Sequence, residues 1–174
     1  MSEVDQRNVT DEFKGLSEDR IVELLDERGA GLEVAVENTL RDFNMGTIVR
    51  SANAFGIRHI HIVGRRQWNK RGAMMTDKYV HMHYHDSFDD LARYAEAHGR
   101  IIIAIDNIAG STPLSTYTDR PSAIMLFGQE GPGLSPEALT HAAHVLAIEQ
   151  NGSTRSLNVG VAAGIAMYAW LTNV

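Results

Sequence analysis

The sequence predicts an α/β domain built on a mainly parallel sheet flanked by helices. From Leu32 onward, apolar segments typical of strands alternate with segments of helical periodicity. Two strand segments, within residues 99–106 and 122–128, are continuous apolar runs, as expected of strands that are buried on both faces. Several strand segments end in loops of glycine and polar residues. These loops are candidate sites, because ligands bind beyond the carboxyl ends of parallel strands.

The first thirty residues are predicted to form an acidic extension with one short helix, followed by the main domain over residues 31–174. Residues 1–15 are charged and lack periodic apolar positions, which is typical of a solvated tail. Ser17 is expected to cap the short helix, and Gly29 to end it. The N-terminus has no hydrophobic signal core and no apolar run reaches the length of a membrane span, so we expect a cytoplasmic protein without membrane contact.

The main domain begins with two strands separated by a helix. Residues 32–38 (LEVAVEN) are expected to form a strand, and residues 45–55 a helix that stops at Gly56. Residues 57–63 are rich in isoleucine and valine and form the next expected strand, which runs into Gly64.

The same alternation continues to the end of the chain. Leu91 and Ala95 lie one turn apart on a predicted helix, and the closing helix is rich in alanine and glycine. The expected elements are a strand over 79–84, a helix over 88–98, strands within 99–106 and 122–128, a short helix over 136–142, a strand over 144–150 and a helix over 158–170.

Charge is distributed unevenly along the chain, although the net charge is only −6. Residues 1–42 hold 12 acidic and 5 basic residues, whereas residues 58–78 hold six basic residues and one acidic residue. This basic segment keeps a nucleic-acid partner compatible with the acidic composition. The chain has no cysteine, which excludes disulfide bonds and zinc sites with cysteine ligands.

Three strand-end loops carry residues suited to ligand binding. Asn44 precedes the helix that carries Arg50, whose guanidinium needs a polar partner if it does not face solvent. Glu130 lies in a loop with three glycines, which allow either close backbone approach to a ligand or a tight turn. The third loop, residues 150–158, enters the closing helix through Ser-Leu-Asn, a pattern typical of an N-capped helix and of a helix start that binds a polar ligand.

These three segments resemble, in the same order, the three motifs of the SpoU-type (TrmH-like) RNA ribose 2′-O-methyltransferases of the SPOUT superfamily. The resemblance covers residues 32–171. The matching residues are Asn44, Gly46, Arg50 and Gly56 in the first motif, Gly128, Glu130, Gly133 and Leu134 in the second, and Ser156, Leu157 and Asn158 in the third. Asp42 departs from the family pattern, which has proline there in many members.

The resemblance implies both a fold and a cofactor site. It implies that the C-terminal segment of the α/β domain forms a trefoil knot. It also implies that S-adenosylmethionine binds in loops matching Ile105, Gly128, Ile148, Ser156 and Leu157. The residue types agree with this cofactor, because a purine and a methionine chain need apolar walls and close backbone approach more than charge.

The reaction implied by the resemblance is methyl transfer from S-adenosylmethionine to a ribose 2′-hydroxyl of RNA. Arg50 matches the residue credited with activating that hydroxyl, and Asn44, Glu130, Ser156 and Asn158 match residues that support it. A guanidinium stays protonated in nearly any protein setting. We therefore expect Arg50 to clamp the adjacent phosphate and stabilise the developing alkoxide, rather than to remove the proton itself.

The resemblance further implies a homodimer that acts on RNA, most often transfer RNA, with ribosomal RNA as the alternative. The residues expected to contact RNA are Arg65, Arg66, Trp68, Lys70 and Arg71, with Trp68 stacking on an unpaired base. The competing interpretation of this segment is a solvated loop around a buried tryptophan.

Two other classes of function are compatible with an α/β domain. A non-catalytic RNA-binding relative is disfavoured by the complete motifs, and a nucleotide-binding oxidoreductase by the absence of GxGxxG after the first strand. His81, His83 and His85 alternate along one strand and share a face. No carboxylate pattern completes a recognised site beside them, so we expect no metal.

Overall fold

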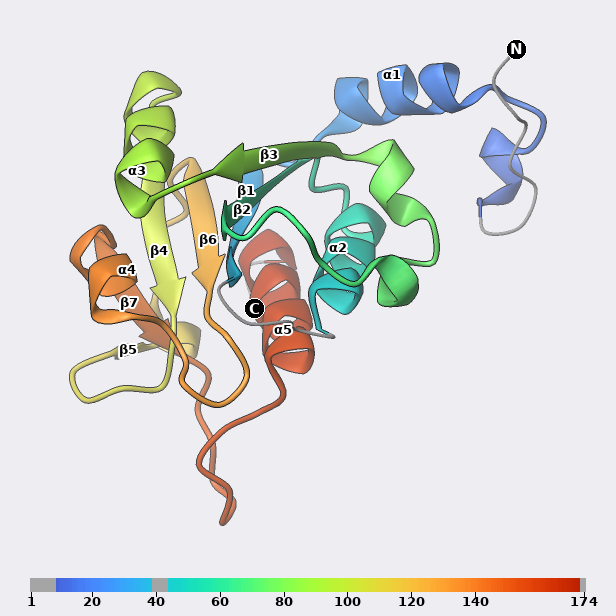
Figure 1. The fold of residues 1–174 in the computed structure, drawn as a ribbon. Helices are drawn as coiled ribbons and strands as arrows, with labels where there is room; N and C mark the ends of the chain where they lie inside the picture. Colours follow the sequence, from blue (N-terminus) through green and yellow to red (C-terminus); the bar gives the residue numbers. More distant parts are fainter. Residues whose placement is uncertain (1–8, 39–43, 173–174) are drawn as a thin grey trace.

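A computed structural model describes residues 9–38 and 44–172 of the chain. Its centre is a seven-stranded sheet in the order β3-β2-β1-β6-β4-β7-β5, and every strand pair is parallel (Figure 1). The strands are β1 Leu32–Asn38, β2 His59–Gly64, β3 His81–His85, β4 Ile101–Ile105, β5 Thr112–Pro113, β6 Ala123–Phe127 and β7 His144–Ala147. The α-helices are α1 Glu18–Arg28, α2 Met45–Ala54, α3 Phe88–Ala97, α4 Pro136–Thr140 and α5 Val159–Thr172. The predicted fold class is confirmed, whereas the trefoil knot stays a prediction.

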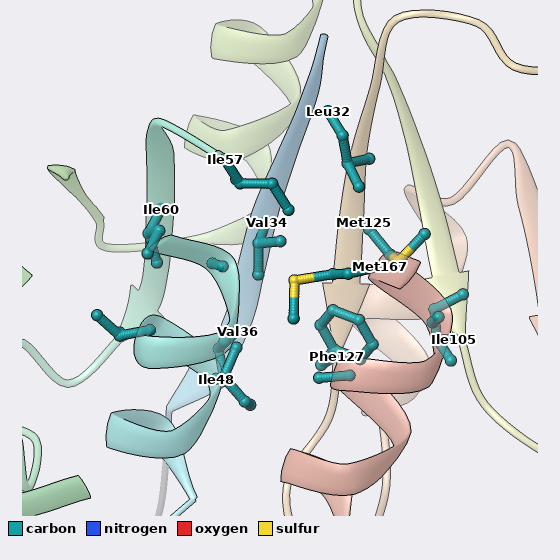
Figure 2. Close-up of a cluster of buried hydrophobic side chains, with 14 of the residues drawn as sticks. Leu32, Val34, Val36, Ile48, Ile57, Ile60, Ile105, Met125, Phe127 and Met167 are labelled. Carbon is teal, nitrogen blue, oxygen red and sulfur yellow. The ribbon is translucent and has the colours of Figure 1, made fainter. Parts of the chain in front are cut away.

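Helices cover both faces of the sheet, as the continuous apolar strands require. Helices α2 and α5 pack on one face and α3 and α4 on the other, so alternate residues of β6 enter different layers. Met125 and Phe127 face α5, whereas Ile124 and Leu126 belong to the layer under α3 and α4. Figure 2 shows the first layer, in which side chains of the sheet meet those of α2 and α5. Each fully buried side chain of this size contributes about 1.5–3 kcal/mol to stability.

The N-terminal segment packs on the domain, which corrects part of its predicted character. Ser17 caps α1, because its side chain accepts a hydrogen bond from the Arg20 amide, and Gly29 follows the helix as predicted. Most of residues 9–15 are exposed, as a solvated tail requires, but Phe13 departs from that description because it is buried against Ile21 and Tyr79. Residues 1–8 lie outside the described part of the chain. The division of the chain near residue 30 stays a prediction.

The remaining predicted elements lie within a few residues of their observed bounds. The largest differences surround Tyr79, which ends a 3-10 turn over Thr76–Tyr79 instead of starting β3. Its side chain packs against the N-terminal segment, and a contact between segments so far apart in the sequence cannot be predicted from local periodicity. The short edge strand β5 is missing from the prediction, because two residues carry no periodic pattern. In the described part of the chain, no helix combines the length and apolarity needed to cross a membrane.

Candidate active site

A cavity opens at the carboxyl ends of β4, β6 and β7, where parallel sheets place their ligands. Its volume is about 390 Å³, within the usual range for small-molecule sites. Its lining residues are Ile105, Asp106, Asn107, Ile108, Phe127, Gly128, Gln129, Glu130, Gly131, Pro132, Gly133, Leu134, Ile148, Gln150, Ser156, Leu157, Asn158, Val159 and Ala162. Every residue predicted to hold the cofactor is therefore on the wall of one cavity.

Hydrogen bonds join one residue from each of the three motifs beside this cavity. The Asn44 amide Nδ2 donates to Glu130 Oε2 at 2.7 Å, and Asn158 Nδ2 donates to Glu130 Oε1 at 3.1 Å. Asn158 Nδ2 also donates to Asn44 Oδ1 at 2.9 Å. Both carboxylate oxygens of Glu130 thus accept hydrogen bonds from the other two motifs. We call Asn44, Glu130 and Asn158 the motif triad.

Asn158 also caps α5, so one side chain performs both tasks that its sequence position suggests. Its Oδ1 atom accepts hydrogen bonds from the amides of Gly160 at 3.0 Å and Val161 at 3.2 Å. Its Nδ2 atom remains available for the other two members of the motif triad. Ser156 and Leu157, just before the cap, line the cavity, and Ser156 is exposed.

The loop after β6 is held in a tight, closed shape. The backbone groups of Gln129 and Gly133 exchange two hydrogen bonds of 3.1 Å, and Gly133 has a positive φ of 73°. The Leu134 amide donates to Asp106 Oδ2 at 3.0 Å. The Ser135 amide donates to the buried carboxylate of Glu37 at 2.9 Å. Sequence reasoning missed Asp106 and Glu37. The position of Asp106 directly after a buried strand was the available signal.

Arg50 lies outside this arrangement within its own chain. Its side chain is exposed on α2, it does not line the cavity, and no described carboxylate pairs with it. The structure therefore places Asn44, Glu130, Ser156 and Asn158 together at the cavity, and Arg50 apart from them. Its position agrees with the alternative of a solvent-facing arginine on an amphipathic helix.

The predicted RNA-contact segment, residues 65–71, contains both free and neutralised cations. Arg66 pairs with Asp86 at 3.3 Å, and Lys70 pairs with Asp77 at 2.7 Å. The hydrogen bond to Asp77 raises the pKa of Lys70. Trp68 is half-buried against the core, with the Lys70 amine 5.6 Å from its ring centre. The observed burial thus favours a packing role for most of this tryptophan.

A column of five imidazoles covers the α3 side of β2 and β3, away from the cavity. The ring order is His81, His59, His83, His61, His85, with successive ring centres 4.7–5.2 Å apart. Two ring-nitrogen contacts of 2.9 Å cross the strands, from His59 to His83 and from His61 to His85. Among the described residues, no group of three or more potential ligands has the arrangement of a metal site.

The environment of three of these histidines, His59, His83 and His85, disfavours protonation. The buried His61 contacts Glu33 at 2.9 Å, a carboxylate that also pairs with Arg100. Burial is the main cause that lowers the pKa of His83, to about 4, and it also lowers the pKa values of His59 and His85. His59, His83 and His85 therefore stay largely neutral in the folded protein at neutral pH.

Stability is consequently expected to fall in mild acid. Below the ordinary histidine pKa of 6.5, histidines of the unfolded chain bind protons. In the folded chain, His83 does not bind its proton until the pH falls to about 4. The stabilisation is complete above pH 6.5 and decreases as pH falls towards 4. Thermal melts between about pH 7.5 and about pH 4.5 should show this decrease, and His83→Gln should flatten it. The slope per proton is about 1.4 kcal/mol per pH unit, and partial exposure makes the His83 share smaller. An unchanged slope in His83→Gln would contradict the assignment.

The fold and the cavity define a parallel α/β domain with a cavity of small-molecule size at the carboxyl edge of its sheet. Residues 31–168 match the model of the SpoU rRNA Methylase family, and the chain belongs to that family. The resemblance of its three motifs is thereby confirmed.

Named relatives and solved structures agree with this membership. The chain is 31% identical over 155 residues to the tRNA (guanosine(18)-2′-O)-methyltransferase of Escherichia coli, a match that covers 86% of this chain and 66% of that protein, slightly less than two thirds of its length. It is also 31% identical over 159 residues to the enzyme of the same name from Thermus thermophilus, covering 86% of this chain and 78% of the other.

Among solved structures, the A. aeolicus TrmH/SpoU tRNA modifying enzyme shares the fold with a TM-score of 0.77 at 24% identity, covering 89% of this chain and 81% of that one. The AdoMet-bound rRNA methyltransferase from Sinorhizobium meliloti has a TM-score of 0.72 at 28% identity, covering 82% and 56% of the two chains.

Proposed function

We propose that this protein transfers a methyl group from S-adenosylmethionine to a ribose 2′-hydroxyl of RNA, with transfer RNA as the substrate. The observation that carries the proposal is the motif triad, which joins all three family motifs at the edge of a ligand cavity. The names of the relatives from Escherichia coli and Thermus thermophilus favour transfer RNA over ribosomal RNA.

The cavity fits the cofactor in size and chemistry. Apolar walls from Ile105, Phe127 and Leu157 suit a purine ring, and the glycine-rich loop offers backbone groups at close range. The described lining contains the carboxylates of Asp106 and Glu130 and no lysine or arginine. This charge suits a ligand with a sulfonium and an ammonium group better than a phosphate. When bound, S-adenosylmethionine supplies the activated methyl group.

The residues of the chain position the reactants and stabilise charge. Glu130 accepts hydrogen bonds from both asparagines of the motif triad, which fixes the three loops around the cavity. Arg50, which stays protonated, is suited to bind the phosphate next to the reacting ribose and to stabilise negative charge that develops on the 2′-oxygen. The proton of the hydroxyl then passes to that phosphate or to water.

Two measurements test the function. Calorimetry should detect binding of S-adenosylmethionine to the purified protein. Mapping of 2′-O-methyl groups should reveal one or more sites in transfer RNA that are absent from a deletion strain and restored by the purified enzyme. Missing sites in ribosomal RNA alone would support the alternative substrate. Binding of RNA without cofactor binding or methyl transfer would identify a non-catalytic relative and overturn the proposal.

We infer that the functional unit is a homodimer joined through α5. This helix is apolar on all sides, yet Val161, Ile165 and Tyr168 are 52%, 42% and 52% exposed along one face. A second copy that covers this face would also lie beside α2. Helix α2 packs on α5, and the ring centres of Phe55 and Tyr168 are 6.1 Å apart. In such a dimer, Arg50 of one subunit would act at the cofactor cavity of the other subunit.

The dimer makes a direct prediction for solution mass. Light scattering of the intact protein should give twice the chain mass. The Ile165→Glu variant should dissociate at micromolar concentration, because it buries a charge in an apolar contact. A monomeric wild-type protein, or a variant that stays fully dimeric, would contradict this interface.

A further inference from the structure

Carboxylates neutralise most of the cations in the described part of the chain. Nine lysine and arginine side chains within residues 9–38 and 44–172 form ion pairs of 4.0 Å or less: Lys14, Arg20, Arg28, Arg58, Arg66, Lys70, Lys78, Arg93 and Arg100. The acidic extension supplies two of these partners to the basic segment 58–78, namely Asp26 for Arg58 and Glu18 for Lys78. The positive balance of that segment is therefore much smaller in the folded protein than in the sequence.

Five described cations have no carboxylate partner, and all are arginines. Arg120 is held within the protein, since one of its terminal nitrogens donates to the carbonyls of Tyr117 and Asp119 and its guanidinium lies 4.9 Å from the centre of the Trp170 ring. The other four, Arg50, Arg65, Arg71 and Arg155, have exposed side chains without a described ion pair. Arginine is the cation best suited to bind phosphate, because its planar fork matches two phosphate oxygens.

Arg50 lies on α2 itself, and the segments that carry Arg71 and Arg155 contact the start of this helix, next to Asn44. The turn Lys70–Ala73, which carries Arg71, touches this helix turn, because a Cβ atom on Gly46 would lie 2.8 Å from Gly72 Cα. The Arg65 amide donates to the carbonyl of Asn38, the last residue of β1, at 2.8 Å. Arg155 lies three residues before Asn158, whose side chain bonds Asn44.

We propose that Arg65, Arg71 and Arg155 bind successive phosphates of the RNA substrate and lead its backbone towards the motif triad. This inference rests on the proposed function and deepens it. Arg65 and Arg71 come from the connection between β2 and β3, and Arg155 comes from the loop before α5; none of the three lines the cofactor cavity. Arg66 and Lys70, although adjacent in sequence, are already compensated by Asp86 and Asp77 and contribute little. The RNA-contact set thus loses two predicted members and gains Arg155.

Salt-dependent RNA binding tests this proposal. The probe is a fluorescein-labelled, unmodified transfer RNA transcript, and its affinity is measured by anisotropy at several salt concentrations. Arg65→Gln, Arg71→Gln and Arg155→Gln should each weaken binding about fivefold. The triple variant should reduce the slope of log affinity against log salt by roughly 2. Each phosphate contact that is lost means that fewer counterions are released when the RNA binds. Arg66→Gln and Lys70→Gln are the matched controls and should change affinity less than twofold.

Cofactor binding separates this inference from the proposed function. All variants should bind S-adenosylmethionine with unchanged affinity by calorimetry, which also shows that they are folded. Equal losses in the control variants and the three arginine variants would overturn the proposal, as would an unchanged salt slope in the triple variant that still methylates RNA. A wild-type protein that binds no RNA overturns both this inference and the proposed function. If the wild-type protein transfers no methyl group but the three arginine variants still weaken RNA binding as expected, only the proposed function is overturned.

Discussion

Replacement of Arg50 by alanine is expected to reduce methyl transfer at least 100-fold while leaving the affinity for S-adenosylmethionine unchanged. Arg50 is exposed on α2 and is not among the residues that line the cavity, so its loss removes no cofactor contact. The proposed reaction develops negative charge on the ribose 2′-oxygen beside a phosphate, and a protonated guanidinium stabilises both. Single-turnover kinetics with saturating RNA, together with calorimetric titration of the cofactor, measure the two quantities separately.

Arg50→Lys is the informative control. It keeps the positive charge but loses the planar fork, so we expect activity between that of the wild type and that of Arg50→Ala. Near-normal turnover by Arg50→Ala would contradict a catalytic role. A parallel loss of cofactor affinity would show that Arg50 acts on the fold of the site instead.

Replacement of Gly128 by alanine is expected to disrupt the cofactor site itself. A Cβ atom on Gly128 would lie 2.4 Å from the carbonyl carbon of Gly133 and 2.5 Å from the Leu134 amide nitrogen. Both are backbone atoms of the closed loop after β6, so no side-chain rotation relieves the clash. Opening the loop would pull Leu134 from Asp106 and move Glu130 relative to Asn44. We expect a cofactor affinity at least tenfold weaker and a loss of about 1–3 kcal/mol in the free energy of unfolding.

Gly152→Ala provides the matched control for this second change. A Cβ atom on Gly152 meets nothing within 4 Å, and its backbone does not need a positive φ. This variant should bind the cofactor as the wild type does. Gly128→Ala with wild-type affinity and melting temperature would show that the loop tolerates expansion, and would remove it as a rigid wall of the site.

The two variants together also test whether subunits share active sites. Arg50→Ala keeps an intact cavity, whereas Gly128→Ala keeps Arg50. If Arg50 serves the cavity of the other subunit, co-refolding the two inactive proteins should restore part of the activity in mixed dimers. If the mixture stays inactive, Arg50 acts at the cavity of its own subunit.

Local sequence patterns predicted the five α-helices and six of the seven strands in the described part of the chain, but none of its 3-10 turns, because periodicity and capping are properties of regular short segments. The strand over 32–38 and the capped helix after Ser17 match their observed bounds closely. The errors concern contacts between distant segments. Phe13 belongs to no periodic pattern, yet it is buried in one cluster with Tyr79, a residue far away in the sequence.

The candidate site divides in the same way. The motifs located the three loops and the residue types, and five predicted cofactor positions lie on one cavity wall. Only the packed structure shows that Asn158 reaches Asn44 across 114 residues and Glu130 across 28 residues. It also adds Asp106 and Glu37, whose function as anchors of the glycine-rich loop depends on strands that are far apart in sequence.

The sequence alone determined the α/β class, the family motifs and the presence of a basic segment, since each of these depends on residue type and local spacing. The tertiary structure decided which charges remain free. Asp26 and Glu18 reach Arg58 and Lys78 only after α1 packs against the domain, whereas Arg71 and Arg155 keep exposed, uncompensated guanidinium groups. Electrostatic compensation depends on distance in space, which composition does not contain.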